Sequence, residues 1–313
     1  MYLSRSARHF PFDHVTNGSV ATIGSFDGFH LGHQALLRHV LEEAQERKLP
    51  SILMSFEPTP KEFFSADKPP ARLMRFREKF DALSAAGVDI FFCPRFNDEM
   101  KRISASTFIR QILVHALNVR HLVIGDDFRF AQDREGHLDM LRRAGRTLGF
   151  SVEQMPSVIA DGNRISSSAI RDALWHGDLD QARRYLGRYY RMSGHVKYGQ
   201  RVGRQLGYPT ANVNLDRKQS AVMGIFAVRV SGSGWGPLDA VASVGTRPTF
   251  DGVKPLLEVH IFDFDRDIYG EYIHVDFIAR LRSEEKFTEV DMLVEQMHKD
   301  AEEAREILAK TKR

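Results

Sequence analysis

The stretch Val20–His33 constrains the fold more than any other part of this 313-residue chain. Its first residues are small and apolar, as in a strand buried inside a parallel sheet, and glycines follow directly. After Gly32 the apolar residues recur with helical spacing, and Leu49-Pro50 ends that pattern. A buried strand, a glycine turn and a helix in this order are typical of an alternating α/β fold.

Two histidines at this turn point to phosphate chemistry. His30 and His33 are three residues apart, so they share one side of the first helical turn. The free N–H groups and positive dipole end of a helix start attract phosphate, and imidazoles there can stabilise charge developing on phosphate oxygens. Two surface histidines near a helix start are the alternative. The His-x-Gly-His spacing after a strand and a glycine turn favours the phosphate site.

The first half of the chain continues the alternation of strands and helices. Predicted strands lie at 51–56, 88–92, 121–125 and 150–155, and predicted helices at 77–86, 104–116 and 137–148. Such alternation indicates a parallel doubly wound sheet. Ligands of such a sheet bind beyond the carboxyl ends of its strands.

Polar motifs follow two of these strands. Asp127 and Arg129 come after the fourth strand and are candidates to contact nucleotide or flavin, unless they only brace a loop as an ion pair. Ser166–Ser168 come after the fifth strand at the start of a helix, with Arg171 one turn on. Serine caps helices well, so one of the three could be a cap only. Three hydroxyls and an arginine together also make a second phosphate cradle.

The second half changes to the period of strands. A short capped helix spans Gly177–Gly187, and we place the domain boundary after it, giving domains 1–187 and 188–313. Beyond it, candidate strands lie at 190–198, 211–215, 225–231, 238–245, 256–264 and 272–281. Short strands separated by glycine turns indicate an antiparallel barrel, and an amphipathic helix at 288–308 closes the chain.

A glycine-rich segment precedes Thr210 and Asn212. It is not a Walker A loop, because Gly-x-x-x-x-Gly-Lys-Ser/Thr is absent from the chain. Glycines still let backbone N–H groups approach phosphate closely. Thr210 and Asn212 share one strand face, and their hydroxyl and amide oxygens are suitable ligands for Mg²⁺. An ordinary loop followed by a polar strand face is the alternative.

Charge and cysteine content exclude some functions. The 44 basic and 41 acidic residues divide at Gly187 into 25 and 23, then 19 and 18. Neither half is a basic domain, so nucleic-acid binding as the main role is disfavoured. Cys93, the single cysteine, lies in an apolar run and is predicted to be part of the core. Met1–Arg8 has no apolar signal-peptide region, and no apolar stretch could span a bilayer, so we expect a cytosolic protein without a membrane partner.

The motif Gly24–His33 resembles the signature of the HxGH nucleotidyltransferases. With Phe26-Asp27-Gly28 in front, it is similar to the adenylyltransferase half of the bacterial bifunctional riboflavin kinase/FAD synthetase family. In that family the serine motif faces the histidine motif across the nucleotide. The resemblance implies that these residues bind ATP: Gly24, Phe26, Asp27, Gly28, His30, His33, Ser166, Ser167, Ser168 and Arg171.

The chain departs from the family pattern at four positions. Thr59 stands where the family usually has histidine, and Ala131 replaces the last glycine of Gly-x-Asp-Phe-x-Phe-Gly. Ser168 replaces a usual threonine and preserves the hydroxyl, while Ser243 stands where asparagine is frequent.

The segment Gly194–Asn212 resembles the riboflavin kinase signature, and further family motifs follow in order as far as Phe287. The resemblance implies ATP and Mg²⁺ binding by Gly194, Gly199, Gly203, Arg204, Gly207, Thr210 and Asn212, the last two as metal ligands. Glu258 lies mid-strand among apolar residues, where a lone carboxylate needs a reason. Kinases of this kind need a carboxylate to deprotonate the attacking hydroxyl. A solvent-facing residue on an edge strand is the alternative.

The resemblance implies a bifunctional enzyme. The barrel would phosphorylate the 5′-hydroxyl of riboflavin with ATP, giving FMN, and the N-terminal domain would adenylylate FMN, giving FAD and pyrophosphate. One rival is an HxGH synthetase that charges RNA, against which stand the near-neutral halves and Ser166–Ser168 in place of a lysine-bearing motif. The other is a non-catalytic flavin sensor, whose discriminating feature would be the loss of a site residue. None is lost among His30, His33, Thr210, Asn212 and Glu258.

Overall fold

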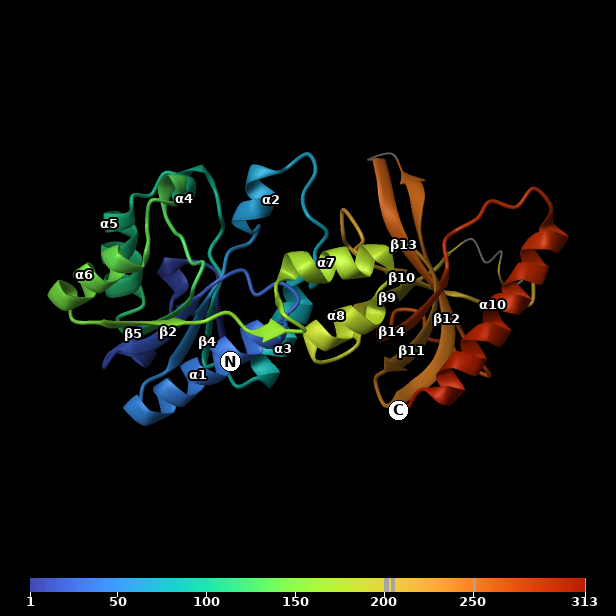
Figure 1. Cartoon of the computed structure of the whole chain (residues 1–313), viewed down its shortest axis with the longest axis horizontal. Helices are drawn as coiled ribbons and strands as arrows, with labels where there is room; N and C mark the ends of the chain where they lie inside the picture. Colours follow the sequence, from blue (N-terminus) through green and yellow to red (C-terminus); the bar gives the residue numbers. More distant parts are fainter. Residues whose placement is uncertain (200–202, 204–205, 250–251, 313) are drawn as a thin grey trace. The chain divides into compact units, whose positions relative to one another are not determined.

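A computed structural model describes residues 1–199, 203, 206–249 and 252–312. The chain forms two compact units (Figure 1). The first comprises Met1–Pro70 and Met74–Ser166, and the second comprises Ala71–Leu73 and Ser167–Arg313. In the described part of the chain, every helix is too short or too polar to cross a membrane.

The first unit is built on a parallel sheet of six strands in the order β1-β4-β3-β2-β5-β6. The strands are β1 (Tyr2–Ser4), β2 (Ser19–Ile23), β3 (Ser51–Met54), β4 (Ile90–Phe92), β5 (Val119–Gly125) and β6 (Ser151–Met155). Five of the six match the predicted strands. The edge strand β1 was not predicted, because three residues are too few to show a period and its pairing with β4 is non-local.

Helices cover both faces of this sheet (Figure 1). They are α1 (Leu31–Arg47), α2 (Pro60–Phe64), α3 (Phe76–Ala85), α4 (Asp98–Lys101), α5 (Ala105–Thr107), the π-helix η3 (Phe108–Ala116) and α6 (Leu138–Leu148). Because strand side chains alternate, Val20 packs with α1 and α3, whereas Ala21 packs with η3 and α6. The helix predicted at 104–116 is present as two consecutive segments, α5 and η3. Cys93 is buried in the core, as predicted.

Short elements connect these layers and lead to the second unit. They are the 3-10 helices η1 (Ala7–His9), η2 (Phe12–Val15) and η4 (Gln132–Arg134), and a hairpin of β7 (Ile159–Ala160) and β8 (Asn163–Arg164). The hairpin was not predicted, because two-residue strands carry no periodic signal.

The second unit is a closed antiparallel barrel in the order β10-β13-β12-β11-β14-β9. Its strands are β9 (Tyr190–Lys197), β10 (Ala211–Asn214), β11 (Gly224–Gly232), β12 (Trp235–Thr249), β13 (Gly252–Ile261) and β14 (Tyr272–Arg282), and its helices are α7 (Ser167–His176), α8 (Leu179–Leu186) and α10 (Val290–Lys310). The predicted barrel and closing helix are confirmed. The buried Arg229 donates to the carbonyls of Leu308 and Thr311 and so holds the end of α10 on the barrel.

The two compact units divide at Ser167, whereas the sequence pattern places the domain boundary after Gly187. The difference consists of α7 and α8, which pack on each other, and α8 also packs on β9 and β14. Tyr185 and Leu186 are buried. The independence of a domain that begins at Arg188 therefore remains a prediction.

Candidate active sites

The two predicted histidines lie at the start of α1. His30 is the N-cap residue, and its Nδ1 accepts a hydrogen bond from the backbone N–H of His33 at 3.3 Å. The two imidazole rings stack with their centroids 3.6 Å apart. His30 is 6% exposed, so the alternative of two surface histidines is wrong. The start of α1 therefore carries two adjacent imidazole rings, as the His-x-Gly-His spacing predicts.

Burial keeps both imidazoles neutral. It lowers the pKa of His30 to about 4, although the Asp27 carboxylate partly opposes this shift. Burial also lowers the pKa of His33 well below its usual value, and the neighbouring His30 and Lys79 act in the same direction. Because His30 Nδ1 accepts a bond, its proton is on Nε2, which can donate to a phosphate oxygen. Neutral stacked rings avoid the repulsion that two imidazolium ions would suffer.

The turn before α1 is shaped around these rings. Phe26 is buried, has a left-handed backbone with φ of 47°, and its ring lies 4.7 Å from that of His33. Asp27 accepts a hydrogen bond from the N–H of Met74 through Oδ1 at 2.9 Å. A methyl group on Gly32 would lie 3.2 Å from the His30 ring, so glycine leaves room for the imidazole. Phe26 and Asp27 thus hold the turn as well as being candidates to bind ATP.

Two cationic side chains near the turn, Lys79 and Arg164, were not predicted from the sequence. Lys79 is buried, and its Nζ donates to the carbonyl of Ser25 at 2.6 Å. Lys79 lies on the apolar face of α3 with Phe76 and Leu83. A lysine among the apolar residues of a helix could have indicated this role from the sequence. Arg164 lowers the pKa of His30 through its charge. Both cations place positive charge beside the two neutral imidazoles.

Asp127 and Arg129, which could have braced the loop as an ion pair, each contact another partner. Asp127 pairs with Arg164 at 2.9 Å, and Asp126 pairs with the same guanidinium at 3.2 Å. Arg129 donates to the carbonyl of Phe128. The loop after β5 is therefore tied to β8 through Arg164. A nucleotide or flavin contact by Asp127 or Arg129 remains a prediction.

The serine motif spans the division between the units. Ser166 ends the first unit, while Ser167, Ser168 and Arg171 belong to α7 of the second. Arg171 donates through Nε to the carbonyl of Ala71, at 2.6 Å within that unit. The predicted helix start at the serines is confirmed. Its approach to the histidine motif across a nucleotide remains a prediction.

One departure from the family pattern, Thr59, has a local explanation, and another, Ala131, has a local cost. Thr59 caps α2, because its hydroxyl accepts from the N–H of Glu62 while Glu62 accepts from the N–H of Thr59 at 2.8 Å. Ala131 has φ of 65° and ψ of −172°, a conformation that favours glycine. The glycine that the family usually has there would relieve this strain.

The barrel aligns the predicted kinase residues. Glu258 on β13 lies directly opposite Asn212 on β10 and opposite Ser243 on β12. Its neighbours Leu257 and Val259 are fully buried, so the half-buried Glu258 points to the other face of the strand. Since β13 has a partner on both sides, the edge-strand alternative is wrong. Asn212 and Glu258 therefore present an amide and a carboxylate on one strand face.

The glycines before β10 make room for these polar groups. A methyl on Gly199 would lie 2.3 Å from the Asn212 amide nitrogen. On Gly203 it would lie 2.4 Å from the Tyr208 carbonyl and 3.3 Å from the Thr210 hydroxyl.

Two further glycines of this segment are described. A methyl on Gly194 would collide with the carbonyl of Asn214, and Gly207 has a left-handed φ of 84°. Arg204 lies outside the described residues. The ATP-binding roles of the segment remain predictions, and close packing accounts for three of its glycines.

A second carboxylate near the barrel strands, that of Glu284, was not predicted from the sequence. The Ser243 hydroxyl hydrogen-bonds the Glu284 carboxylate, whose pKa is raised by burial. A methyl on Gly245 would collide with that carboxylate. Ser243, the departure from the family's asparagine, thus retains a polar contact beside Glu258.

Comparisons with known proteins extend over the whole chain. The FAD synthetase family model matches residues 13–169, and the riboflavin kinase family model matches residues 186–308. The bifunctional riboflavin kinase/FMN adenylyltransferase of Escherichia coli K12 is 45% identical over 94% of each chain. The protein of the same name from Pseudomonas fluorescens is 43% identical over 99% of this chain and 98% of its own.

A solved structure has the same fold. It is titled a macrolide-efflux protein from Streptococcus pneumoniae, is 31% identical, and superimposes with a TM-score of 0.79 over 97% of this chain and 98% of its own. The two enzyme regions follow each other in the order that the sequence predicts. The chain belongs to the family of bifunctional riboflavin kinase/FMN adenylyltransferases.

Proposed function

We propose that this chain makes FAD from riboflavin in two ATP-dependent steps, one in each unit. In the barrel, the riboflavin 5′-hydroxyl attacks the γ-phosphate of ATP, giving FMN and ADP. In the first unit, the FMN phosphate attacks the α-phosphate of a second ATP, giving FAD and pyrophosphate. One observation supports each step: the pairing of Glu258 with Asn212, and the neutral imidazole pair at the start of α1.

In the kinase step, Glu258 is the general base. Its carboxylate takes the proton of the attacking hydroxyl, as kinase chemistry requires. Thr210 and Asn212 provide a hydroxyl and an amide oxygen, which fit Mg²⁺ as it is usually bound, with phosphate oxygens and waters as the remaining ligands. When bound, Mg²⁺ would neutralise charge on the transferred phosphoryl group.

In the adenylyl step, hydrogen-bond donors replace a covalent nucleophile. The N–H groups at the start of α1 and the Nε2–H of His30 are positioned to donate to α-phosphate oxygens. Such donors stabilise the charge that builds up in the transition state. Ser166–Ser168 and Arg171 complete this phosphate site in our proposal, and Asp127 or Arg129 contacts the nucleotide or flavin.

The substrates are accordingly riboflavin, FMN and ATP. We propose that the protein works in the cytosol. The basis is that no apolar stretch of the sequence could span a bilayer and that the single cysteine is buried. The family assignment favours this enzyme over both an RNA-charging synthetase and a flavin sensor.

Product analysis tests the proposal. Purified full-length protein is incubated with riboflavin, ATP and Mg²⁺, and flavins are separated by chromatography. FMN should appear first and FAD should follow, and FMN supplied directly should give FAD alone. Heat-denatured protein is the control. Failure to form either flavin product would overturn the corresponding half of the proposal.

A further inference from the structure

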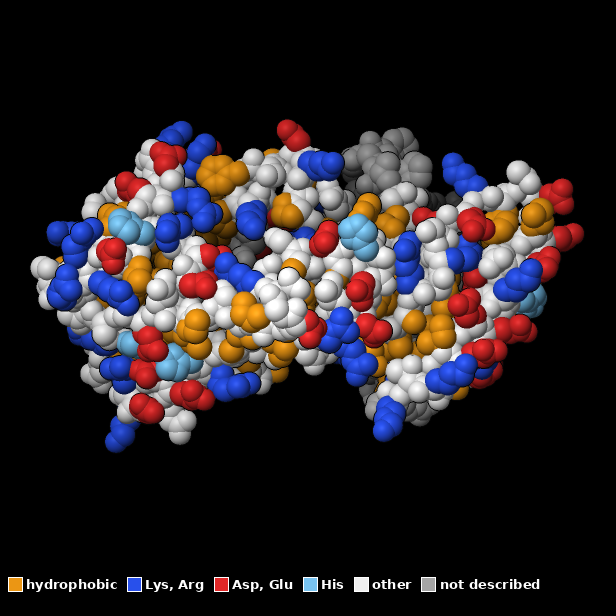
Figure 2. All heavy atoms as spheres, viewed as in Figure 1, with side chains coloured by type: hydrophobic (Ala, Val, Ile, Leu, Met, Phe, Trp, Pro, Cys, Tyr) orange, Lys and Arg blue, Asp and Glu red, His pale blue; other side chains and the backbone are white. Residues whose placement is uncertain are grey.

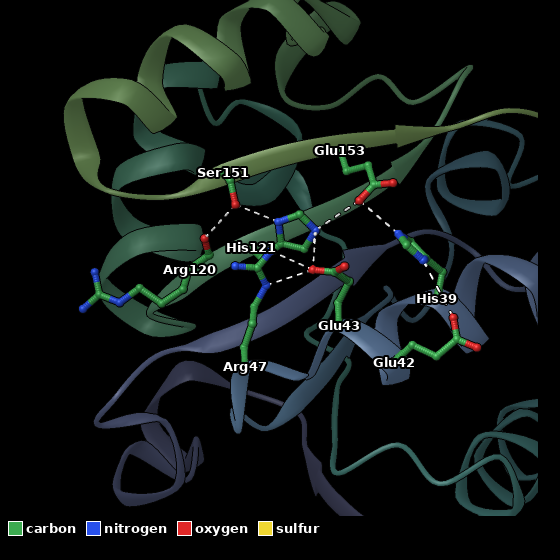
Figure 3. Close-up of polar contacts among 8 residues, drawn as sticks. All are labelled: His39, Glu42, Glu43, Arg47, Arg120, His121, Ser151 and Glu153. Carbon is green, nitrogen blue, oxygen red and sulfur yellow. Dashed lines mark hydrogen bonds and ion pairs between the residues drawn. The ribbon is translucent and has the colours of Figure 1, made fainter. Parts of the chain in front are cut away.

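A cluster of two histidines and two glutamates lies in the first unit away from the glycine turn (Figure 3). His39 and Glu43 are one helical turn apart on α1, and they face His121 on β5 and Glu153 on β6. The ligand atoms of His39, Glu43 and Glu153 all lie within 4.8 Å of one another. Three separate elements of the fold thus bring imidazole and carboxylate groups together.

The buried His121 directs a lone pair into this cluster. Its Nδ1 lies 2.7 Å from the hydroxyl of Ser151, which in turn donates to the carbonyl of Arg120 at 3.3 Å. With its own proton on the Arg120 carbonyl, the Ser151 hydroxyl can accept from Nδ1–H of His121. In this tautomer of His121, Nε2 carries a lone pair.

That lone pair has carboxylates opposite it. Nε2 of His121 lies 3.5 Å from Glu43 and 3.4 Å from Glu153, and among the described residues it has no hydrogen-bond partner. His121 is 5% exposed, so this nitrogen is shut off from solvent. A lone pair facing two carboxylates is repulsive unless a cation lies between them. The arrangement therefore calls for a positive charge at this point.

From these contacts, we propose that His39, Glu43, His121 and Glu153 bind one divalent transition-metal ion, with Zn²⁺ the best fit. Tetrahedral Zn²⁺ with ligands at about 2.1 Å separates them by roughly 3.4 Å, the distance from Nε2 of His121 to Oε2 of Glu153. His39 approaches Glu153 at 2.9 Å through Nε2, while its Nδ1 faces Glu42 at 3.9 Å. A carboxylate or hydroxyl behind each ligating ring is the usual support of a metal-binding histidine.

Two neighbouring charges bear on the site. Arg47 donates twice to Oε2 of Glu43, at 2.9 and 2.7 Å, and this is the oxygen that faces His121. Glu43 would therefore bind a cation through its other carboxylate oxygen. Glu42 is the second neighbouring charge, and its Oε2 lies 3.9 Å from Nδ1 of His39. The side chains of His39 and Glu153 are 26% and 42% exposed, so a cation can reach the cluster. Figure 2 shows histidine and acidic side chains next to one another on the surface of the first unit.

The site would act as a structural clamp. It joins the second half of α1 to β5 and β6, with His39 about 1.7 turns and Glu43 about 2.8 turns along the helix from His33. Bound Zn²⁺ would therefore stabilise the unit that carries the adenylyl site without touching the substrates.

Zn²⁺ binding to full-length protein tests this inference. The protein is freed of metal with a chelator, dialysed into millimolar Mg²⁺ and titrated with Zn²⁺ by calorimetry, and Co²⁺ is added separately to follow its visible absorption. We expect the wild type to bind one more equivalent of Zn²⁺ than Glu153→Gln. Zn²⁺ binding should also raise the unfolding temperature of the wild type. Tetrahedral Co²⁺ bands should appear only with the intact cluster.

Matched variants separate the ligands from their surroundings. Glu46→Gln removes an exposed carboxylate from the same helix and should bind Zn²⁺ like the wild type. Ser151→Ala removes the support of His121 and should weaken Zn²⁺ binding by about 10- to 100-fold. Circular dichroism checks that each variant is folded. Equal Zn²⁺ binding by the wild type and Glu153→Gln, or equal loss in Glu46→Gln, would overturn the proposal.

Discussion

The two proposed sites present opposite kinds of groups to phosphate. The glycine turn of the first unit offers backbone N–H groups and neutral imidazoles, which are donors. The barrel offers the oxygens of Thr210, Asn212 and Glu258, of which the carboxylate can only accept when ionised. Donors can bind phosphate directly, whereas acceptors need a cation in between. The comparison teaches that each site's chemistry follows from the element that carries it, a helix start or a strand face.

Removing His33 should give the largest effect and separate the two steps. His33→Ala deletes a group beside the proposed α-phosphate, so FAD formation should fall by about 10² to 10³. FMN should then accumulate from riboflavin, which chromatography of the products measures. His33→Asn keeps a hydrogen-bond donor and should recover part of the FAD rate. Normal FAD output from His33→Ala would remove His33 from the site.

Changing Glu258 tests the barrel in the same way. Glu258→Gln keeps size and hydrogen bonding but removes the base, so riboflavin phosphorylation should fall by roughly 10² or more. Conversion of added FMN to FAD should continue, because Glu258 has no part in the proposed adenylyl site. Both rates are measured on one preparation. If the variant phosphorylated riboflavin at the wild-type rate, Glu258 would have only a structural role.

Fragments sharpen the comparison by separating the units. Arg188–Arg313 contains Thr210, Asn212 and Glu258 and should still make FMN, while Ser167–Arg313 also keeps α7 and α8 on the barrel. Both lack Ala71–Leu73, whose carbonyls accept from the buried Arg217, so both should unfold at lower temperature than the full chain.

Flavin chromatography measures the activity of each fragment, and circular dichroism measures its folding. Activity in the longer fragment only would move the functional boundary from Gly187 to Ser167. A folded but inactive longer fragment would show that the barrel depends on the first unit.

Acid should destabilise the first unit through its neutral imidazoles. The pKa of His30 is about 4 in the folded state against 6.5 for the free side chain, so the unfolded chain binds the proton first. Stability is therefore intact above pH 6.5 and falls as the pH drops toward 4, by on the order of 3 kcal/mol for this group. Denaturant unfolding at several pH values measures it. His30→Gln should flatten the dependence, and an unchanged slope would contradict the buried, neutral ring.

The smallest expected effect is at Ala131. Ala131→Gly places glycine where φ is 65° and ψ is −172°, and should stabilise the first unit by about 1 kcal/mol because the strain of alanine there is relieved. Thermal unfolding measures the change. Ala144→Gly, within α6, is the matched control and should destabilise by a similar amount. A loss of stability in Ala131→Gly would show that the backbone is not strained there.

Periodicity and short motifs predicted much of both units. Short apolar runs placed five of the six parallel strands, because these strands are buried on both faces. Period-two patterns placed all six barrel strands. The short edge strand β1 and the β7–β8 hairpin escaped, since neither is long enough to show a period. The motif around His30 located the helix start, because a strand, a glycine turn and a cap are local features.

Local sequence determined the strands, the helix starts and the residue types of both proposed sites. Tertiary structure alone decided which distant groups meet these sites: Lys79 and Arg164 near His30, and Glu284 against Ser243. It likewise brought His121 against Glu43 in the proposed metal cluster. It also decided that His30 and His33 are neutral, since burial sets their pKa values. The physical reason is that hydrogen bonding along the backbone is local, whereas burial and charge pairing depend on segments far apart in the chain.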